Sequence, residues 1–124
     1  MPEQGSRILI VDDDDDVRDA LSMILEAEGY RVAYSENGRE ALQYLESHPP
    51  PCVVLLDLMM PVMNGWEFLS AKDADANLAA IPVVVVTAAG ESGTRQLRDR
   101  TILPKPVAIQ DLLDTVGRYC GKTA

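Results

Sequence analysis

Hydrophobic residues are grouped into short runs along the chain, and stretches with helical spacing separate these runs. Three runs are continuously apolar and rich in β-branched residues or leucine, which is typical of strands covered on both faces. One run alternates apolar and polar positions, as a strand at the edge of a sheet does, and the last is short and ends at Pro104. The predicted strands cover residues 7–11, 30–34, 52–56, 81–86 and 101–103.

Apolar stripes at helical spacing lie between and after the predicted strands. Their members are Val17, Leu21, Ile24 and Leu25; Ala41, Leu42 and Leu45; Trp66, Phe68 and Leu69; and Ile109, Leu112, Leu113, Val116 and Cys120. The first stripe stops before Gly29, a common signal for a helix end. A further helix is expected between residues 90 and 100. It is predicted to be short or irregular, because Leu97 is its only large apolar residue and both Gly90 and Gly93 disfavour a helix.

Strands that alternate with helices at this spacing form βαβ units, which build a parallel sheet with helices on both faces. Right-handed crossovers then give a doubly wound arrangement. The predicted fold class is therefore α/β, a five-stranded parallel sheet of the flavodoxin-like (βα)5 type. The 124 residues fit one domain, residues 1–124. The sequence leaves open whether this domain works alone or belongs to a longer protein.

Composition and charge narrow the possible functions. The chain is 47% hydrophobic and 25% charged, as soluble globular proteins are. Its net charge of −9 argues against direct binding of nucleic acid or of an anionic membrane surface. It contains neither an apolar run of the roughly 20 residues that span a membrane nor a secretory signal. A cytoplasmic location is expected, with Cys52 and Cys120 as reduced, buried, small hydrophobic residues.

Polar residues stand where the predicted strands end. Asp12 and Asp13 follow the first strand, and Asp57 follows the third. Thr87 follows the fourth strand, and Lys105 comes shortly after the fifth. Doubly wound sheets bind ligands at the carboxyl ends of their strands. Three carboxylates, one hydroxyl and one ammonium group are therefore expected to meet at one edge of the sheet.

These groups suit phosphoryl transfer. Clustered carboxylates repel one another and are tolerated together with a hard cation such as Mg²⁺. A carboxylate among them can act as a nucleophile towards phosphorus, while a metal and a lysine offset the charge of the phosphoryl oxygens. A simpler interpretation of an acidic run is that it caps a helix and complements the helix dipole. We accept this for Asp14, Asp15 and Asp16, and favour metal binding for Asp12 and Asp13.

The same residues resemble a known family. Residues 8–13, 55–65 and 81–88, followed by the pair Lys105 and Pro106, resemble the bacterial response-regulator receiver domain, a chemotaxis-Y-like phosphoacceptor. The resemblance extends over essentially the whole chain. Its most specific part is the stretch from residue 57 to residue 65 together with the Lys–Pro pair.

The resemblance implies a signalling switch and not a metabolic enzyme. It implies that Asp57 accepts a phosphoryl group from a sensor histidine kinase or a phosphotransfer protein, while Thr87 and Lys105 contact that group. The implied Mg²⁺ ligands are three carboxylates and one backbone carbonyl: Asp12, Asp13, Asp57 and Met59. The resemblance also implies a downstream protein partner, docked on the face of the fourth helix, fifth strand and fifth helix, and either a monomer or a phosphorylation-dependent dimer.

Two departures from the family pattern concern the face expected to dock partners. Ile102 stands where receivers usually carry an aromatic residue, and the stretch from residue 87 to residue 105 is short. The alternative is therefore a receiver-like scaffold that works without phosphorylation. Two other classes fit less well. An aspartyl-phosphate phosphohydrolase commonly has a second acid two residues after its nucleophile, where this chain has Met59, and a nucleotide-binding module has a glycine-rich loop after the first strand.

Overall fold

Five parallel strands form the centre of the molecule in a computed structural model, which describes residues 7–88, 97 and 100–121. They are β1 (Arg7–Val11), β2 (Arg31–Ser35), β3 (Val53–Leu56), β4 (Val83–Thr87) and β5 (Thr101–Pro104). Their order in the sheet is β2-β1-β3-β4-β5, with every neighbouring pair parallel. The predicted doubly wound, flavodoxin-like sheet is confirmed. Thr87 is the last residue of β4 and does not follow that strand.

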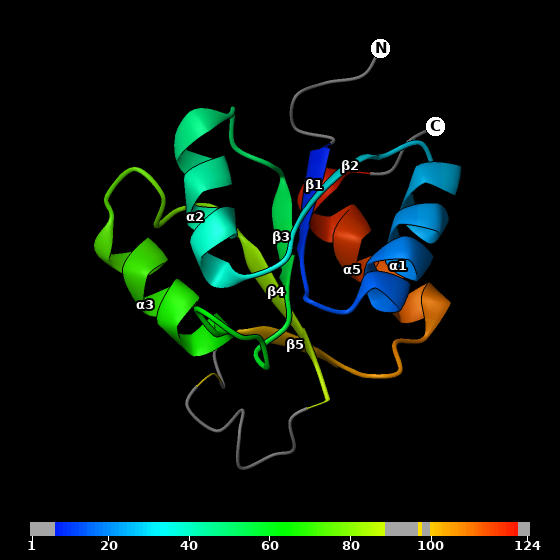
Figure 1. Cartoon of the computed structure of the whole chain (residues 1–124). Helices are drawn as coiled ribbons and strands as arrows, with labels where there is room; N and C mark the ends of the chain where they lie inside the picture. The colour runs from blue at the N-terminus through cyan, green and yellow to red at the C-terminus, as the bar shows by residue number, and fades with distance from the viewer. Residues whose placement is uncertain (1–6, 89–96, 98–99, 122–124) are drawn as a thin grey trace.

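Helices cover both faces of the sheet. Those described are α1 (Asp15–Ala27), α2 (Gly38–Ser47), α3 (Gly65–Ala74) and α5 (Ile109–Cys120). Helices α2 and α3 lie on one face, and α1 and α5 lie on the other (Figure 1). The helix expected between residues 90 and 100 falls almost entirely outside the described residues.

The strands are continuously apolar because each buries both of its faces. In β1, Leu9 and Val11 belong to the core under α2 and α3, whereas Ile8 and Ile10 belong to the core under α1 and α5. All four residues of β3 are buried in the same alternating manner. This is the burial that the sequence pattern predicts for central parallel strands.

Side chains just before the helices satisfy backbone amides that have no partner within the helix. The carboxylate of Asp14 accepts from the amides of Asp16 and Val17 at the start of α1. Asn64 and Glu67 form a capping box at the start of α3. The prediction that Asp14, Asp15 and Asp16 form the cap and first turn of a helix is therefore confirmed.

The expectation for the two cysteines was wrong, because Cys52 and Cys120 form a disulfide. Cys52 directly precedes β3, and Cys120 is the last residue of α5. Helices in βα units run back against their strands, so the carboxyl end of α5 lies beside the amino end of β3. The two Cα atoms are 5.2 Å apart, within the range that disulfides span. A separation of 68 residues leaves no local sign of this pairing in the sequence.

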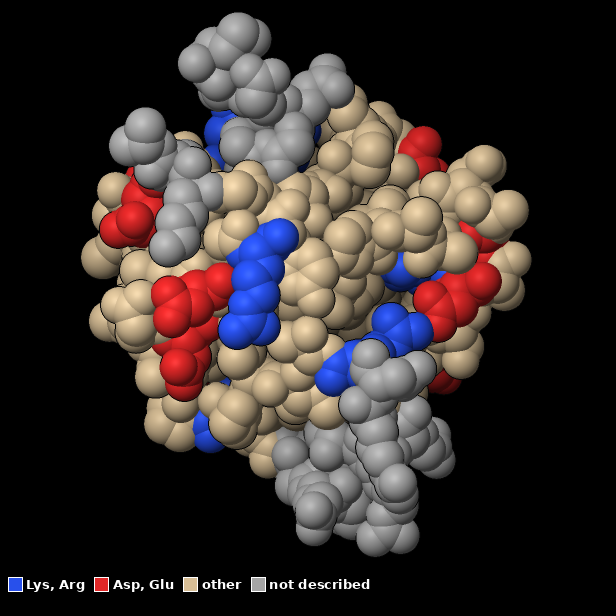
Figure 2. Space-filling model, turned by 180° about the vertical axis from the view of Figure 1, so that it is seen from behind, with Lys and Arg blue, Asp and Glu red and all other residues tan. Residues whose placement is uncertain are grey.

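Charged side chains are spread over the surface. On the face seen in Figure 2, basic side chains lie beside acidic ones, with wide uncharged areas between them. No helix in the described part of the chain is long and apolar enough to cross a membrane.

Candidate functional site

Backbone hydrogen bonds continue the sheet beyond the strand ends. The amide of Asp57 donates to the carbonyl of Val11 at 2.9 Å, and the amide of Lys105 donates to the carbonyl of Thr87 at 3.0 Å. The amide of Asp12 donates in the same way, at 3.1 Å, to the last residue of β2. These bonds hold Asp12, Asp57 and Lys105 in one row along the carboxyl edge of the sheet.

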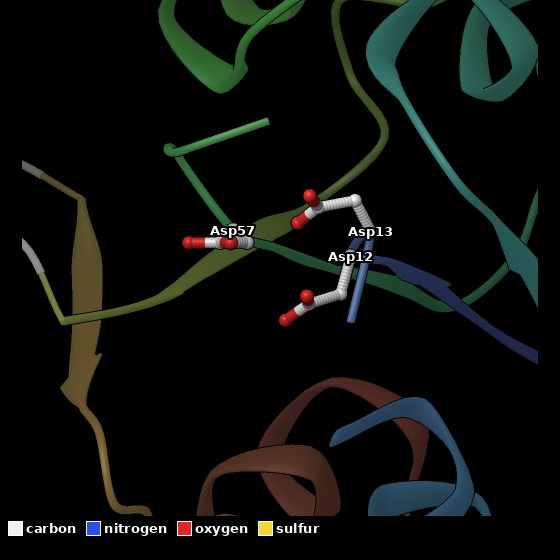
Figure 3. A group of neighbouring side chains, drawn as sticks. All are labelled: Asp12, Asp13 and Asp57. Atoms are coloured by element: carbon white, nitrogen blue, oxygen red, sulfur yellow. The ribbon is translucent and has the colours of Figure 1, made fainter. Parts of the chain in front are cut away.

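Three carboxylates converge at this edge, as the sequence predicts. The side chains of Asp12, Asp13 and Asp57 extend towards the same side of the strand ends (Figure 3). Each offers an oxygen within 4.8 Å of an oxygen of the others. Asp12 and Asp57 are only 2% and 5% exposed, whereas Asp13 is exposed. The cluster therefore opens to solvent on the side of Asp13.

Lys105 supplies the positive charge of this cluster. Its Nζ atom donates to Oδ2 of Asp12 at 2.8 Å and lies 3.6 Å from Oδ2 of Asp57. Burial lowers the pKa of Lys105, but the hydrogen bond and charge of Asp12 and the charge of Asp57 outweigh this effect, so the pKa is raised. The ammonium group therefore stays protonated at neutral pH. The peptide bond between Lys105 and Pro106 is cis.

Several neighbouring groups shift the pKa of Asp57 in opposite directions. Burial raises its pKa, the Lys105 charge lowers it, and the neighbouring charge of Asp12 raises it again. The Met59 amide, 3.3 Å from Oδ1, and a hydrogen bond from the Thr87 hydroxyl lower it. Burial and Asp12 prevail, and the pKa of Asp57 is raised above its ordinary value. Asp57 is thus a buried acid whose ionised form depends on nearby positive charge and hydrogen-bond donors.

Arg18 is part of this site, and the sequence interpretation missed it. Its guanidinium group donates to the backbone carbonyl of Asp12 at 2.7 Å and pairs with the carboxylate of Asp15. It also lies over the ring of Tyr34, 4.9 Å from the ring centre. Asp12 is fixed further through Oδ1, which accepts from the Asp14 amide at 2.9 Å. The three-residue spacing of Asp15 and Arg18 on a helix was the available signal.

Gly65 allows α3 to approach the loop that follows β3. Its amide donates to the carbonyl of Leu58 at 3.0 Å. A β-carbon at residue 65 would lie 2.6 Å from the carbonyl oxygen of Asp57 and 2.7 Å from the α-carbon of Leu58. In the same loop, Val62 has a φ of 68°, which is a strained conformation for a β-branched residue. The glycine therefore sets how closely the helix holds the backbone of Asp57.

The carboxylates fit a hard divalent cation. Opposite ligands of an octahedral Mg²⁺ lie about 4.2 Å apart, from metal–oxygen distances of about 2.1 Å. At least two of the three ligand pairs must be adjacent, about 3.0 Å apart, so the carboxylate oxygens, which lie within 4.8 Å of one another, would draw closer together around the ion. When all groups are ionised, three carboxylates and one ammonium leave two negative charges, which one Mg²⁺ balances. The backbone carbonyl of Met59 stays a predicted ligand.

A groove of about 520 Å³ lies next to Lys105, between α1 and the residues that lead into α5. Most of its lining is apolar: Val17, Ala20, Leu21, Ile24, Ala88, Pro106 and Val107. The cluster of Asp12, Asp13 and Asp57 is therefore bordered by an apolar surface on the side of Lys105.

Residues 8–117 match a known protein family, the response regulator receiver domain. The chain belongs to this family. Receivers are signalling proteins and not metabolic enzymes, in agreement with the sequence interpretation.

Two curated relatives have different lengths. The transcriptional regulatory protein CpxR homolog of Haemophilus influenzae is 42% identical over 124 residues, covering 96% of this receiver and 52% of that protein. Protein PilH of Pseudomonas aeruginosa is 38% identical over 117 residues, covering 90% of this receiver and 95% of PilH. The chain therefore spans about half of the first relative and nearly all of the second.

A solved structure supports the same family. It is the receiver domain of the sensor histidine kinase PA1611 from Pseudomonas aeruginosa, which has a magnesium ion coordinated in its active-site cleft. The TM-score is 0.85 at 26% identity, and the match covers 95% of this receiver and 99% of that chain.

Replacing Gly65 by alanine is expected to destabilise this receiver by roughly 1–3 kcal/mol, because the added methyl group meets backbone atoms of Asp57 and Leu58. Urea unfolding measures the change. Ser70→Ala, at an exposed position of the same helix, is the control and should stay within about 0.5 kcal/mol of the parent. Equal stability of the two variants would show that the loop moves away from α3 at little cost.

Proposed function

We propose that this receiver accepts a phosphoryl group on Asp57 in a Mg²⁺-dependent reaction and thereby switches its contacts with other proteins. The observation that carries the proposal is the convergence of Asp12, Asp13 and Asp57 on one edge of the sheet with Lys105 between two of them. A purely structural cluster would have little reason to bury two acids beside a third.

In the proposed reaction, a carboxylate oxygen of Asp57 attacks phosphorus as the nitrogen–phosphorus bond of a phosphohistidine breaks. Lys105 lies 3.6 Å from this carboxylate and would pair with a phosphoryl oxygen. Thr87, at the end of β4, would donate its hydroxyl to another phosphoryl oxygen. Mg²⁺, when bound, would neutralise charge on the phosphoryl oxygens. The groups proposed to hold it are the three carboxylates and the backbone carbonyl of Met59.

The proposed phosphodonor is a sensor histidine kinase or a phosphotransfer protein in the cytoplasm. The family membership supports this, and the apolar groove beside Lys105 offers surface on which such a donor can rest. A downstream protein would read the phosphorylated state. We propose a monomer or a phosphorylation-dependent dimer, with residues 1–124 acting as one domain.

One observation favours the alternative of a scaffold that works without phosphorylation. Ile102 pairs with Val85 in the sheet and packs against the core under α2 and α3. A branched aliphatic side chain here cannot swing as an aromatic ring does between buried and exposed positions. The output movement must then differ from that of receivers with a ring, or be absent. Phosphorylation of Asp57 followed by a change in partner binding separates these alternatives.

Asp57→Asn is expected to abolish labelling by acetyl phosphate and Mg²⁺, because the amide keeps the shape of the side chain without its nucleophilic oxygen. Intact-mass spectrometry detects the bound phosphoryl group. Asp19→Asn, which removes an exposed acid of α1, is the matched control and should label like the parent. A labelled Asp57→Asn variant would place the phosphoacceptor elsewhere.

Asp13→Asn is expected to reduce the rise in melting temperature that Mg²⁺ causes, because it removes one proposed ligand. Without Mg²⁺ the variant should be as stable as the parent or slightly more so, since repulsion within the acidic cluster falls. Differential scanning fluorimetry with and without Mg²⁺ measures both effects. Asp16→Asn, in the same acidic run but in the first turn of α1, should keep the full Mg²⁺ response. A full response in Asp13→Asn contradicts the metal assignment.

The phosphoryl group is expected to persist for minutes or longer on the isolated receiver. Hydrolysis needs a water held in line with the acyl phosphate, and Met59, which is 60% exposed beside Asp57, has no strong hydrogen-bonding group to hold one. Met59→Asn should therefore shorten the lifetime several-fold, as measured by loss of the label over time. Loss within seconds from the parent in Mg²⁺ buffer would rule out this explanation.

A further inference from the structure

A disulfide joins the two cysteines at the end of the sheet away from the acidic cluster. Cys52 directly precedes β3, whose carboxyl end leads to Asp57, and Cys120 closes α5. They are the only two cysteines in the sequence. A thiol of one therefore has a single possible partner within the chain.

The disulfide holds the carboxyl end of α5. Two hydrogen bonds act at the same place: the Tyr30 hydroxyl donates to the carbonyl of Gly121 at 2.7 Å, and the hydroxyls of Tyr119 and Thr101 lie 3.1 Å apart. The last turn also contains Gly117, a weak helix former. This turn therefore depends on its tethers more than on its own helical propensity.

The amino end of α5 is held less firmly. Its N-cap residue, Ala108, has no side chain that can accept from the first amides of the helix. The middle of the helix is fixed by Leu112 and Val116, both fully buried under the sheet. Loss of the covalent link would leave the carboxyl end of α5 held by these two hydrogen bonds alone, and the rest of the helix by its central turns.

Both cysteines lie at the border of the core and not inside it. Cys52 and Cys120 are each partly exposed, and neither belongs to the fully buried core. Exchange of a disulfide requires a thiolate to reach one of its sulfur atoms. A site at this half-buried position can be opened to such a reagent by a local movement of the last turn of α5.

We propose that Cys52 and Cys120 form a reversible thiol–disulfide site, a second chemical input that fastens or releases the carboxyl end of α5. The proposal rests on the proposed cytoplasmic location, because disulfides in reducing compartments are mostly transient or redox-sensing. The site lies at the end of the sheet opposite the acidic cluster, and its redox state would act as a signal in addition to phosphorylation.

The oxidant is the disulfide of a low-molecular-weight thiol. The thiolate of one cysteine attacks this disulfide, forms a mixed disulfide and releases one small thiol. The second cysteine, as its thiolate, then attacks the protein sulfur of the mixed disulfide and releases the other small thiol. The two cysteines lose two electrons and two protons in total, and the small disulfide gains them. Excess small thiol reverses both steps.

A redox titration of the folded chain of 124 residues tests the site. The protein is equilibrated with mixtures of reduced and oxidised glutathione, quenched with acid, alkylated and weighed by mass spectrometry. We expect a conversion from two alkylated thiols to none, in a monomer, that runs in both directions. Cys52→Ser and Cys120→Ser should each show one thiol or one glutathione adduct. A link that excess reduced glutathione leaves intact, or one that forms only between chains, overturns the proposal.

Hydrogen exchange of the two states tests the effect on α5. Amides in residues 117–121 should exchange faster in the reduced protein and in Cys120→Ser than in the oxidised protein, while amides of β1 should change little. The oxidised chain should also melt roughly 10 °C or more higher, because the link restricts a long segment of the unfolded chain. Equal exchange at the carboxyl end of α5 in both states would overturn the proposal that the disulfide fastens this end.

Asp57 labelling in the same samples keeps the two proposals separate. Labelling of Cys52→Ser and Cys120→Ser is expected to match that of the parent, since neither cysteine contacts the acidic cluster. Absence of labelling in every sample contradicts the proposed phosphoacceptor, whereas absence of reversible thiol chemistry contradicts only the redox site.

Discussion

The pairing of Lys105 with Asp12 and Asp57 is the interaction on which the site depends. Two acids that are almost fully buried, with a third beside them, repel one another unless a positive charge lies among them. Lys105 supplies that charge from the end of β5, two strands away from β3. The backbone hydrogen bonds that continue the sheet beyond β1, β3 and β5 bring these groups together. The sheet thus determines that the two buried acids and the lysine lie next to one another.

The remaining negative charge explains why the site fits a cation. Lys105 is shared between two carboxylates and is closer to Asp12 than to Asp57. Asp13 lies on the open side of the cluster, where a hydrated ion can enter. Arg18 does not reduce this charge directly, because its partners are the carbonyl of Asp12 and the carboxylate of Asp15. It fixes the backbone that carries the two acids.

Much of this could be predicted from the sequence, and the failures have physical causes. The apolar runs predicted the strands. The rule that ligands bind at the carboxyl ends of parallel strands predicted that Asp12, Asp57 and Lys105 lie close together. The rule does not say which acid is buried, because burial depends on loops and neighbouring helices. It could not pair Cys52 with Cys120 either, since that contact depends on where a helix ends relative to a distant strand. Helix α5 joins the two ends of the sheet, beginning soon after the lysine and ending at the disulfide.

The most direct measurement of the central claim is Mg²⁺ binding to Lys105→Met. Two unit charges about 4 Å apart interact by about 1 kcal/mol even in bulk water, and by twice that when one is divalent. Removing the ammonium group should therefore destabilise the Mg²⁺-free protein and tighten Mg²⁺ binding by roughly tenfold or more. Isothermal titration calorimetry measures the affinity, with Arg39→Met, at an exposed position of α2, as control. An affinity in Lys105→Met equal to that of the parent would show that the lysine and the metal do not share these carboxylates.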